Sequence, residues 1–147
     1  MEGRVDAEKS PLSNRNKMDV IELKPTKHTP GVLMDGKENI VHFVGRSLPE
    51  NAGKFFSPII EWLREYATTC QDKIKTQQVL RVTFEMTYFN TSTHRALLEI
   101  FKVLKEIQTK GPGVKVEWRY EMGDERMIEA GDDLSEITGL PIIKKAS

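Results

Sequence analysis

Three hydroxyl side chains follow one another at Thr91-Ser92-Thr93, directly after Asn90. The preceding segment alternates apolar and polar residues and predicts a strand, and the apolar spacing that follows predicts a helix. Free backbone N–H groups and the positive end of a helix dipole meet where such a helix begins. Asn90 or a neighbouring hydroxyl is therefore expected to cap the helix, which is the commoner role on pattern alone. A hydroxyl at this place can also accept a phosphoryl group.

A second candidate is the segment 45–53, whose glycines, proline and small residues are typical of a shaped loop. Arg46 lies in this loop, where it is able to face a phosphate. The chain contains neither GxxxxGK[ST] nor a strand-GxGxxG-helix pattern, so nothing supports a nucleotide cradle. A loop that leads into a helical turn is the simpler interpretation.

The other reactive side chains form no recognisable catalytic or metal-binding set. His28, His42 and His94 are scattered and show no HxxxH or HExxH spacing. Cys70 is the only cysteine, which excludes an intramolecular disulfide and a multi-cysteine metal site. The carboxylates between residues 124 and 133 lack the spacing of a calcium loop and indicate a solvated helix face or, alternatively, a partner surface. We therefore expect no enzyme, no metal and no cofactor.

Composition argues against two large classes of partner. Lys plus Arg and Asp plus Glu each number 22, so the formal net charge is zero and no overall field favours nucleic acid or an anionic membrane. No apolar run approaches the roughly 20 residues of a membrane helix. Residues 1–17 lack the apolar segment of a signal peptide and are predicted to be disordered, with Met18 as an alternative start. We expect a cytoplasmic protein with one domain over residues 18–147.

The elements that must position these residues follow from hydrophobic periodicity. Asp35-Gly36 is a tight-turn signal and predicts an opening β-hairpin. Ser57-Pro58 combines an N-cap residue with a proline suited to the first helical position, so a helix is expected to begin there and run to about Thr69. Further helices are expected after the 90–93 cluster and after Asp124, which is a candidate cap for the last helix. The expected strands cover residues 20–23, 29–34, 40–44, 79–89, 114–120 and 140–143.

This order of elements, β-β-α-β-α-β-α-β, predicts an α/β fold. Strands that alternate with helices pair mostly in parallel through right-handed crossovers, and the hairpin adds an antiparallel part. The expected architecture is a mixed, mostly parallel sheet with the helices packed on it.

Several short motifs stand in a fixed order along the chain: Thr29-Pro30, residues 45–52, Phe55-Phe56, Trp62, residues 88–92, residues 118–120 and residues 129–131. Through their order and spacing, residues 19–143 resemble the SiaC family of bacterial regulatory phosphoproteins. The resemblance implies the STAS-like fold of SpoIIAA-type anti-sigma-factor antagonists. The chain departs from the family pattern at Thr93, where a serine is usual, and at Leu48, where an aromatic residue is common.

The resemblance also implies a switch. In the family, the threonine after the strand-ending asparagine is phosphorylated by a dedicated kinase and dephosphorylated by a PP2C-type phosphatase. That position is Thr91 here, with Ser92 and Thr93 left open as alternative acceptors. The unphosphorylated form is expected to bind and activate a target such as a diguanylate cyclase, and the phosphorylated form to release it. The expected partner contacts are Asn90, Ser92, Thr93, His94, Arg46, Glu50 and Asn51.

Two other functions are compatible with the sequence. A small-ligand sensor would use a cleft between the 45–53 loop and the 90–94 turn. An enzyme with an unrecognised site would need several titratable side chains that converge in one pocket. The sequence predicts no such convergence.

Overall fold

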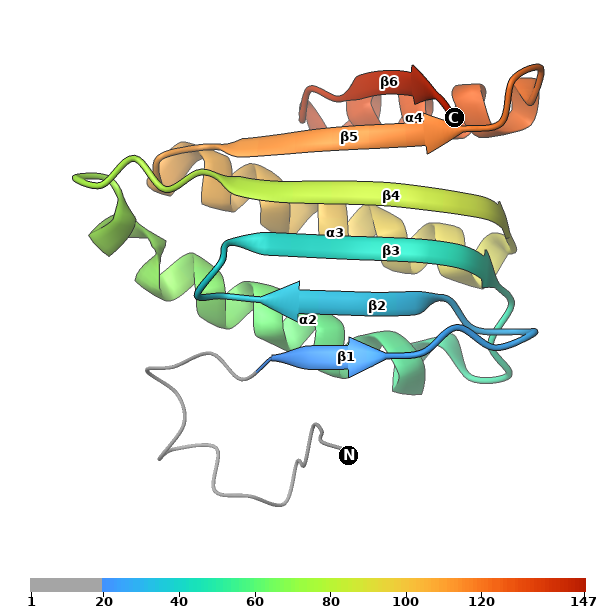
Figure 1. The fold of residues 1–147 in the computed structure, drawn as a ribbon, viewed down its shortest axis with the longest axis horizontal. Helices are drawn as coiled ribbons and strands as arrows, with labels where there is room; N and C mark the ends of the chain where they lie inside the picture. The colour runs from blue at the N-terminus through green and yellow to red at the C-terminus, as the bar shows by residue number, and fades with distance from the viewer. Residues whose placement is uncertain (1–19) are drawn as a thin grey trace.

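The computed structural model describes residues 20–147, so the predictions for residues 1–17 and Met18 lie outside the described residues. Within this range six strands form one sheet, and three α-helices follow its third, fourth and fifth strands (Figure 1). In chain order the elements are β1 (Ile21–Leu23), β2 (Gly31–Asp35), β3 (Ile40–Ser47), α2 (Ala52–Thr69), the short 3-10 helix η1 (Cys70–Lys73), β4 (Leu80–Phe89), α3 (Thr91–Lys110), β5 (Val114–Tyr120), α4 (Glu125–Thr138) and β6 (Ile143–Ala146).

The strands lie in the sheet in their order along the chain, from β1 to β6. β1, β2 and β3 pair antiparallel, and β3 to β6 pair in parallel. The predicted mixed sheet with an opening hairpin is therefore confirmed. Asp35 organises the hairpin turn, because its Oδ1 accepts hydrogen bonds from the backbone N–H groups of Lys37 (3.0 Å) and Glu38 (3.1 Å).

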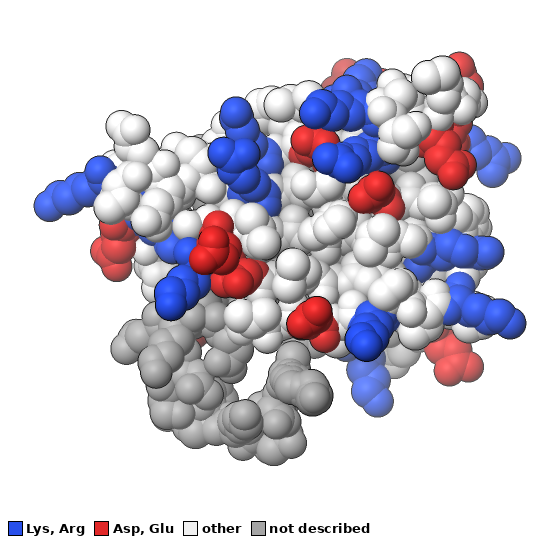
Figure 2. All heavy atoms as spheres, in the orientation of Figure 1, with Lys and Arg blue, Asp and Glu red and all other residues white. Residues whose placement is uncertain are grey.

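All three helices cover the same face of the sheet (Figure 1). This follows from the topology, since each crossover moves one strand further in the same direction and right-handed crossovers then stay on one side. The opposite face, which Figure 2 shows, carries interspersed acidic and basic side chains. One pair on it joins His42 Nε2 to Glu85 Oε1 across β3 and β4 at 3.2 Å.

The core lies between the sheet and the helices and is built around aromatic rings. Phe84 in β4 stacks on Phe43 in β3 with ring centroids 5.0 Å apart, and it also contacts Phe101 in α3 and Trp118 in β5 at 5.4 Å each. All four rings are at most 1% exposed. The alternation that predicted β4 is confirmed, because its apolar members from Leu80 to Met86 are buried.

The contact between α4 and β5 depends on the absence of a side chain at Gly131. The indole Nε1 of Trp118 donates a hydrogen bond to the backbone oxygen of Met127 at 2.8 Å. A Cβ atom at Gly131 would lie 2.6 Å from that nitrogen, closer than packing allows. Two motifs that carry the family resemblance, residues 118–120 and 129–131, thus meet in a packing contact.

The predicted start of the first helix is wrong. α2 begins six residues before Pro58, and Asn51 caps it by accepting a hydrogen bond from the N–H of Lys54 at 3.0 Å. Pro58 lies inside the helix, where it removes one helical hydrogen bond. The helix continues through Pro58 because its buried face includes residues on both sides of the proline, with Phe56 before it and Ile59 after it.

The predicted last strand is shifted by three residues. Leu140 belongs to the buried core, not to a strand, and β6 pairs with β5 from Ile143 onward. Gly139 ends α4 in a left-handed conformation (φ 78°), and its N–H bonds to the oxygen of Ser135. The chain therefore turns one residue before Leu140, which fills the core beneath the helix end.

Candidate functional site

The three helices begin at one edge of the sheet, because each follows the carboxyl end of a parallel strand (Figure 1). Each first turn is capped by an acidic or amide side chain. Asn90 Oδ1 accepts a hydrogen bond from the N–H of Thr93 at 3.0 Å, and Asp124 Oδ1 accepts one from the N–H of Met127 at 3.2 Å. Of the two kinds of cap predicted for α3, the structure shows Asn90 and not a hydroxyl group, and the predicted cap Asp124 is confirmed.

Thr91 is the first residue of α3, and its side chain is exposed. Within residues 20–147 its hydroxyl has no hydrogen-bond partner. The cap of α3 is supplied by the side chain of Asn90 and not by Thr91. The hydroxyl therefore faces solvent at the positive end of the α3 dipole. This is the placement that modification by another enzyme requires.

Thr93 occupies the opposite environment, and its prediction as a partner contact is wrong. Its side chain is 0% exposed. Thr93 Oγ1 donates to the backbone oxygen of Ser47 at 3.2 Å and lies 2.8 Å from Ser47 Oγ. Thr93 thus fastens the start of α3 to the end of β3, and burial excludes it as an acceptor of phosphate in the folded protein.

Ser92 and His94 are half-buried. Ser92 Oγ donates a hydrogen bond to the capping Oδ1 of Asn90 at 3.1 Å, so it supports the cap. The His94 ring stacks on Phe89 with centroids 6.3 Å apart. Both side chains remain partly accessible, but each already has a structural contact, unlike Thr91.

The predicted contacts from the facing loop do not converge on one point. The guanidinium of Arg46 lies 5.9 Å from the centre of the Tyr88 ring at the end of β4. Glu50 and Asn51 instead line a separate pocket of about 620 Å³, together with His28 and Phe55. The structure therefore places Arg46 against Tyr88 and leaves Glu50 and Asn51 in a different hollow.

A pocket of about 300 Å³ lies beside Thr91, between the end of β4 and the first turns of α3 and α4. Asp124, which caps α4, lines this pocket together with Arg126 and Met127 from the first turn of α4. Sequence reasoning did not assign these residues to the site. The only signals were the acidic stretch 124–133 and the 129–131 motif, and neither indicates that α4 begins next to Thr91.

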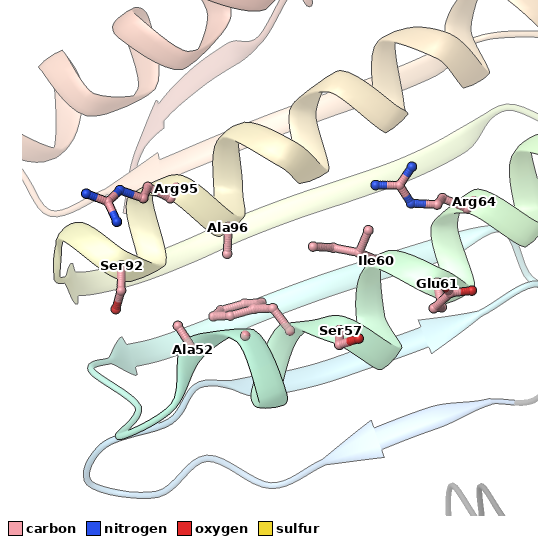
Figure 3. Close-up of a pocket in the computed structure, with 10 residues that line it drawn as sticks. Ala52, Ser57, Ile60, Glu61, Arg64, Ser92, Arg95 and Ala96 are labelled. Atoms are coloured by element: carbon pink, nitrogen blue, oxygen red, sulfur yellow. The ribbon is translucent and has the colours of Figure 1, made fainter.

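The ligand-sensor alternative stays a prediction, because the 45–53 loop and the 90–94 turn do lie next to each other. These segments are joined at Ser47, whose backbone oxygen accepts hydrogen bonds from the N–H of Asn90 (3.1 Å) and from Thr93 Oγ1. A hollow of about 510 Å³ extends from these segments between α2 and α3, and its lining includes Ala52, Gly53 and Ser92 (Figure 3).

Comparison with known proteins decides the family. The sequence profile described as "SiaC family regulatory phosphoprotein" matches residues 23–145. This chain belongs to the SiaC family. It is 26% identical over 129 residues to an uncharacterized protein of Pseudomonas aeruginosa (strain UCBPP-PA14), an alignment that covers 88% of this chain and 98% of that protein.

Two solved structures resemble this SiaC-family protein over most of its length. Apo-SiaC from Pseudomonas aeruginosa is 25% identical with a TM-score of 0.74, covering 87% of this chain and 99% of the other. A SiaC chain in the complex of diguanylate cyclase SiaD with its activator SiaC, from the same organism, is 25% identical with a TM-score of 0.76, covering 86% and 99%. The predicted family and fold class are confirmed, and the family is one of regulatory proteins.

Chemistry elsewhere in this SiaC-family protein is limited. Within residues 20–147, no three His, Cys, Asp or Glu side chains are grouped so as to hold a metal ion. Burial raises the pKa of the Cys70 thiol, which lies at the far end of α2 from Thr91. No helix in the described range is long and apolar enough to cross a membrane.

Proposed function

We propose that this SiaC-family protein is a non-enzymatic regulator that a dedicated kinase switches by phosphorylating Thr91 in the cytoplasm. A PP2C-type phosphatase resets the switch. The unphosphorylated form binds and activates a diguanylate cyclase, and the phosphorylated form releases it. The observation that carries the proposal is the exposed hydroxyl of Thr91, which has no hydrogen-bond partner within the described residues while its neighbours Ser92 and Thr93 are engaged.

A phosphate at this place is compatible with the folded domain. It adds about −1.5 to −2 charges at neutral pH. The first turn of α3 favours negative charge through its dipole, and the Thr91 side chain already points outward. The modification therefore changes the surface and not the fold, which is what a reversible switch between partners needs.

Support for a protein target comes from the same edge of the sheet. SiaC from Pseudomonas aeruginosa forms a complex with the diguanylate cyclase SiaD as its activator. In this chain two large apolar side chains are exposed at the carboxyl ends of neighbouring strands, Tyr88 in β4 (43%) and Met122 just after β5 (81%). Exposed aromatic and methionine side chains beside polar groups are typical of protein interfaces.

The modification is tested by incubating the chain with candidate protein kinases from its own organism and with ATP. Intact mass should rise by one phosphate, and peptide mass spectrometry should locate it on Thr91. Thr91→Ala should abolish the addition, while the matched variant Ser92→Ala should retain it. Phosphate on Ser92 in the unaltered chain would refute the site.

The consequence of the modification is tested with the proposed target, a diguanylate cyclase from the same organism. The unphosphorylated chain should bind it and raise its rate of cyclic-di-GMP synthesis. The phosphorylated chain should do neither, and treatment with the phosphatase should restore both. Equal activation by the two forms would refute the switch while leaving the modification itself intact.

A further inference from the structure

The pocket of about 300 Å³ beside Thr91 is walled by three elements. The end of β4 contributes residues 87–89, the first turn of α3 contributes Thr91, and the first turn of α4 contributes Arg126. Thr91 and Arg126 are far apart in the chain, so only the fold brings them to one pocket. A group attached to the Thr91 hydroxyl therefore stands at the wall of a hollow that a second helix also lines.

A β-bulge shapes the β4 wall of this pocket. In the ladder with β3, Met86 pairs with Gly45, but the next paired residue of β4 is Tyr88. Thr87 between them is the extra residue, and a bulge of this kind changes the direction of the side chains that follow it. Thr87 and Tyr88 are both exposed, whereas regular alternation would bury one of them. The pocket is therefore bounded on this side by residues that the bulge turns outward.

The charges of the pocket are few, and only one of them is free. Among residues 20–147, the charged side chains that line it are Asp124 and Arg126. Asp124 is committed to the cap of α4, where its Oδ1 accepts a hydrogen bond from the N–H of Met127 at 3.2 Å. Arg126 is exposed and forms no ion pair or hydrogen bond within the described range, although Glu129 follows three residues later on the same helix. The pocket thus joins a free guanidinium to the free hydroxyl of Thr91.

We propose that Arg126 binds the phosphate of phosphorylated Thr91 across this pocket and so fastens the first turn of α3 to the first turn of α4. The inference rests on the proposed function, because it assumes a phosphate on Thr91. A guanidinium presents a planar fork of N–H donors that matches two phosphate oxygens, and such charge-assisted pairs are stronger than neutral hydrogen bonds. The phosphate supplies the acceptor that the pocket lacks in the unmodified chain.

Two other charges act on the phosphate. Asp124 repels it, but this carboxylate is held by the N–H of Met127, and the α4 dipole partly balances its charge. Arg95 lies four residues after Thr91 and is its neighbour on the surface of α3. Arg95 lines the separate hollow between α2 and α3, not this pocket. A phosphate that turns into the pocket meets Arg126, and one that turns along α3 meets Arg95.

The pair would change the surface of two helices at once. The phosphate occupies the pocket, and the guanidinium of Arg126 is no longer free to bind a partner's carboxylate. The fold itself stays the same, because neither side chain has a structural contact to lose within the described residues. One modification therefore alters a wider surface than the Thr91 side chain alone.

The pair is tested on chains that carry phosphothreonine at position 91 through site-specific incorporation during translation, so that no kinase is needed. The phosphate is titrated by ³¹P NMR at low ionic strength, where charge pairs are least screened. A guanidinium beside the phosphate stabilises the dianion and lowers the second pKa of the phosphate, which is about 6 without it. Arg126→Gln should raise that pKa, so that the phosphate binds its second proton about two to five times more tightly.

Arg81→Gln is the matched control, because Arg81 is an exposed arginine of β4 that does not line the pocket. Its phosphate pKa should equal that of the otherwise unaltered chain, and melting temperatures should show that all variants are folded. An unchanged pKa in Arg126→Gln would overturn the pair, as would an equal rise in Arg81→Gln. A rise found only in Arg95→Gln would also overturn it, since the phosphate would then turn along α3.

Failure of the proposed function would appear in other measurements. It would be seen as absent phosphate after incubation with kinases, or as equal activation of the cyclase by both forms. The NMR titration depends on neither result, because the phosphate is installed during translation.

Discussion

The turn at the start of α3 and the contact between α4 and β5 both contain motifs that carry the family resemblance, but they use them in opposite ways. At the α4–β5 contact, Trp118 and Gly131 are buried and fit each other closely. At the α3 turn, Asn90 is fixed by its capping bond while the next residue, Thr91, is exposed and unbonded within the described residues. A shared motif thus marks packing in one region and an accessible group in the other, and stability measurements should separate them.

The largest effect is expected at the packing contact. Gly131→Ala places a methyl group against the Trp118 indole and should lower the free energy of unfolding by as much as about 3 kcal/mol. Gly53→Ala is the matched control, because Gly53 lies in α2 with only ordinary contacts around its missing Cβ. That substitution should raise the free energy of unfolding by up to about 1 kcal/mol. Urea denaturation measures both, and equal effects would argue against a special role of Gly131.

A smaller loss is expected from the buried hydroxyl of the α3 turn. Thr93→Val keeps the shape of the side chain but removes the hydrogen bonds to Ser47, and it should lower the free energy of unfolding by about 1–2 kcal/mol. The folded variant should still be phosphorylated on Thr91. Loss of phosphorylation without loss of stability would contradict the structural role of Thr93.

The Asn90 cap of α3 should contribute less to the free energy of unfolding than the buried hydroxyl of Thr93 does. Asn90→Ala removes the acceptor for the N–H of Thr93 and should lower the free energy of unfolding by about 1 kcal/mol. Asn90→Asp supplies an equivalent oxygen and should be close to neutral. If alanine and aspartate had the same effect in urea denaturation, the capping bond would not be what Asn90 contributes.

The smallest change in the free energy of unfolding is expected at Thr91, the residue to which the proposed function gives the largest role. Thr91→Ala removes an exposed hydroxyl that has no partner in the described structure, and it should change the free energy of unfolding by less than about 0.5 kcal/mol. The same variant should lose phosphorylation completely. A destabilisation as large as that of Thr93→Val would mean that the Thr91 hydroxyl has a structural partner in solution.

The elements were largely predictable because their signals are local. The alternation of apolar and polar residues predicted β4 and β5, and the Asp35-Gly36 turn signal predicted the hairpin. Asp124 was predicted as a cap. Ser57-Pro58 misled because a proline is also tolerated inside a helix whose buried face continues on both sides of it. The last strand was misplaced because Leu140 is an apolar residue that fills the core beneath the end of α4 and does not lie in a strand.

By itself the sequence determined the order of strands and helices, the capping residues of α3 and α4, and the membership of the family, since these depend on neighbouring residues and on motif order. Only the tertiary structure decided which hydroxyl of the 91–93 cluster is accessible, because that depends on the side of α3 that meets Ser47. It also brought α4 beside Thr91 and left a hollow between α2 and α3. Those contacts join residues far apart in the chain, and no local pattern specifies them.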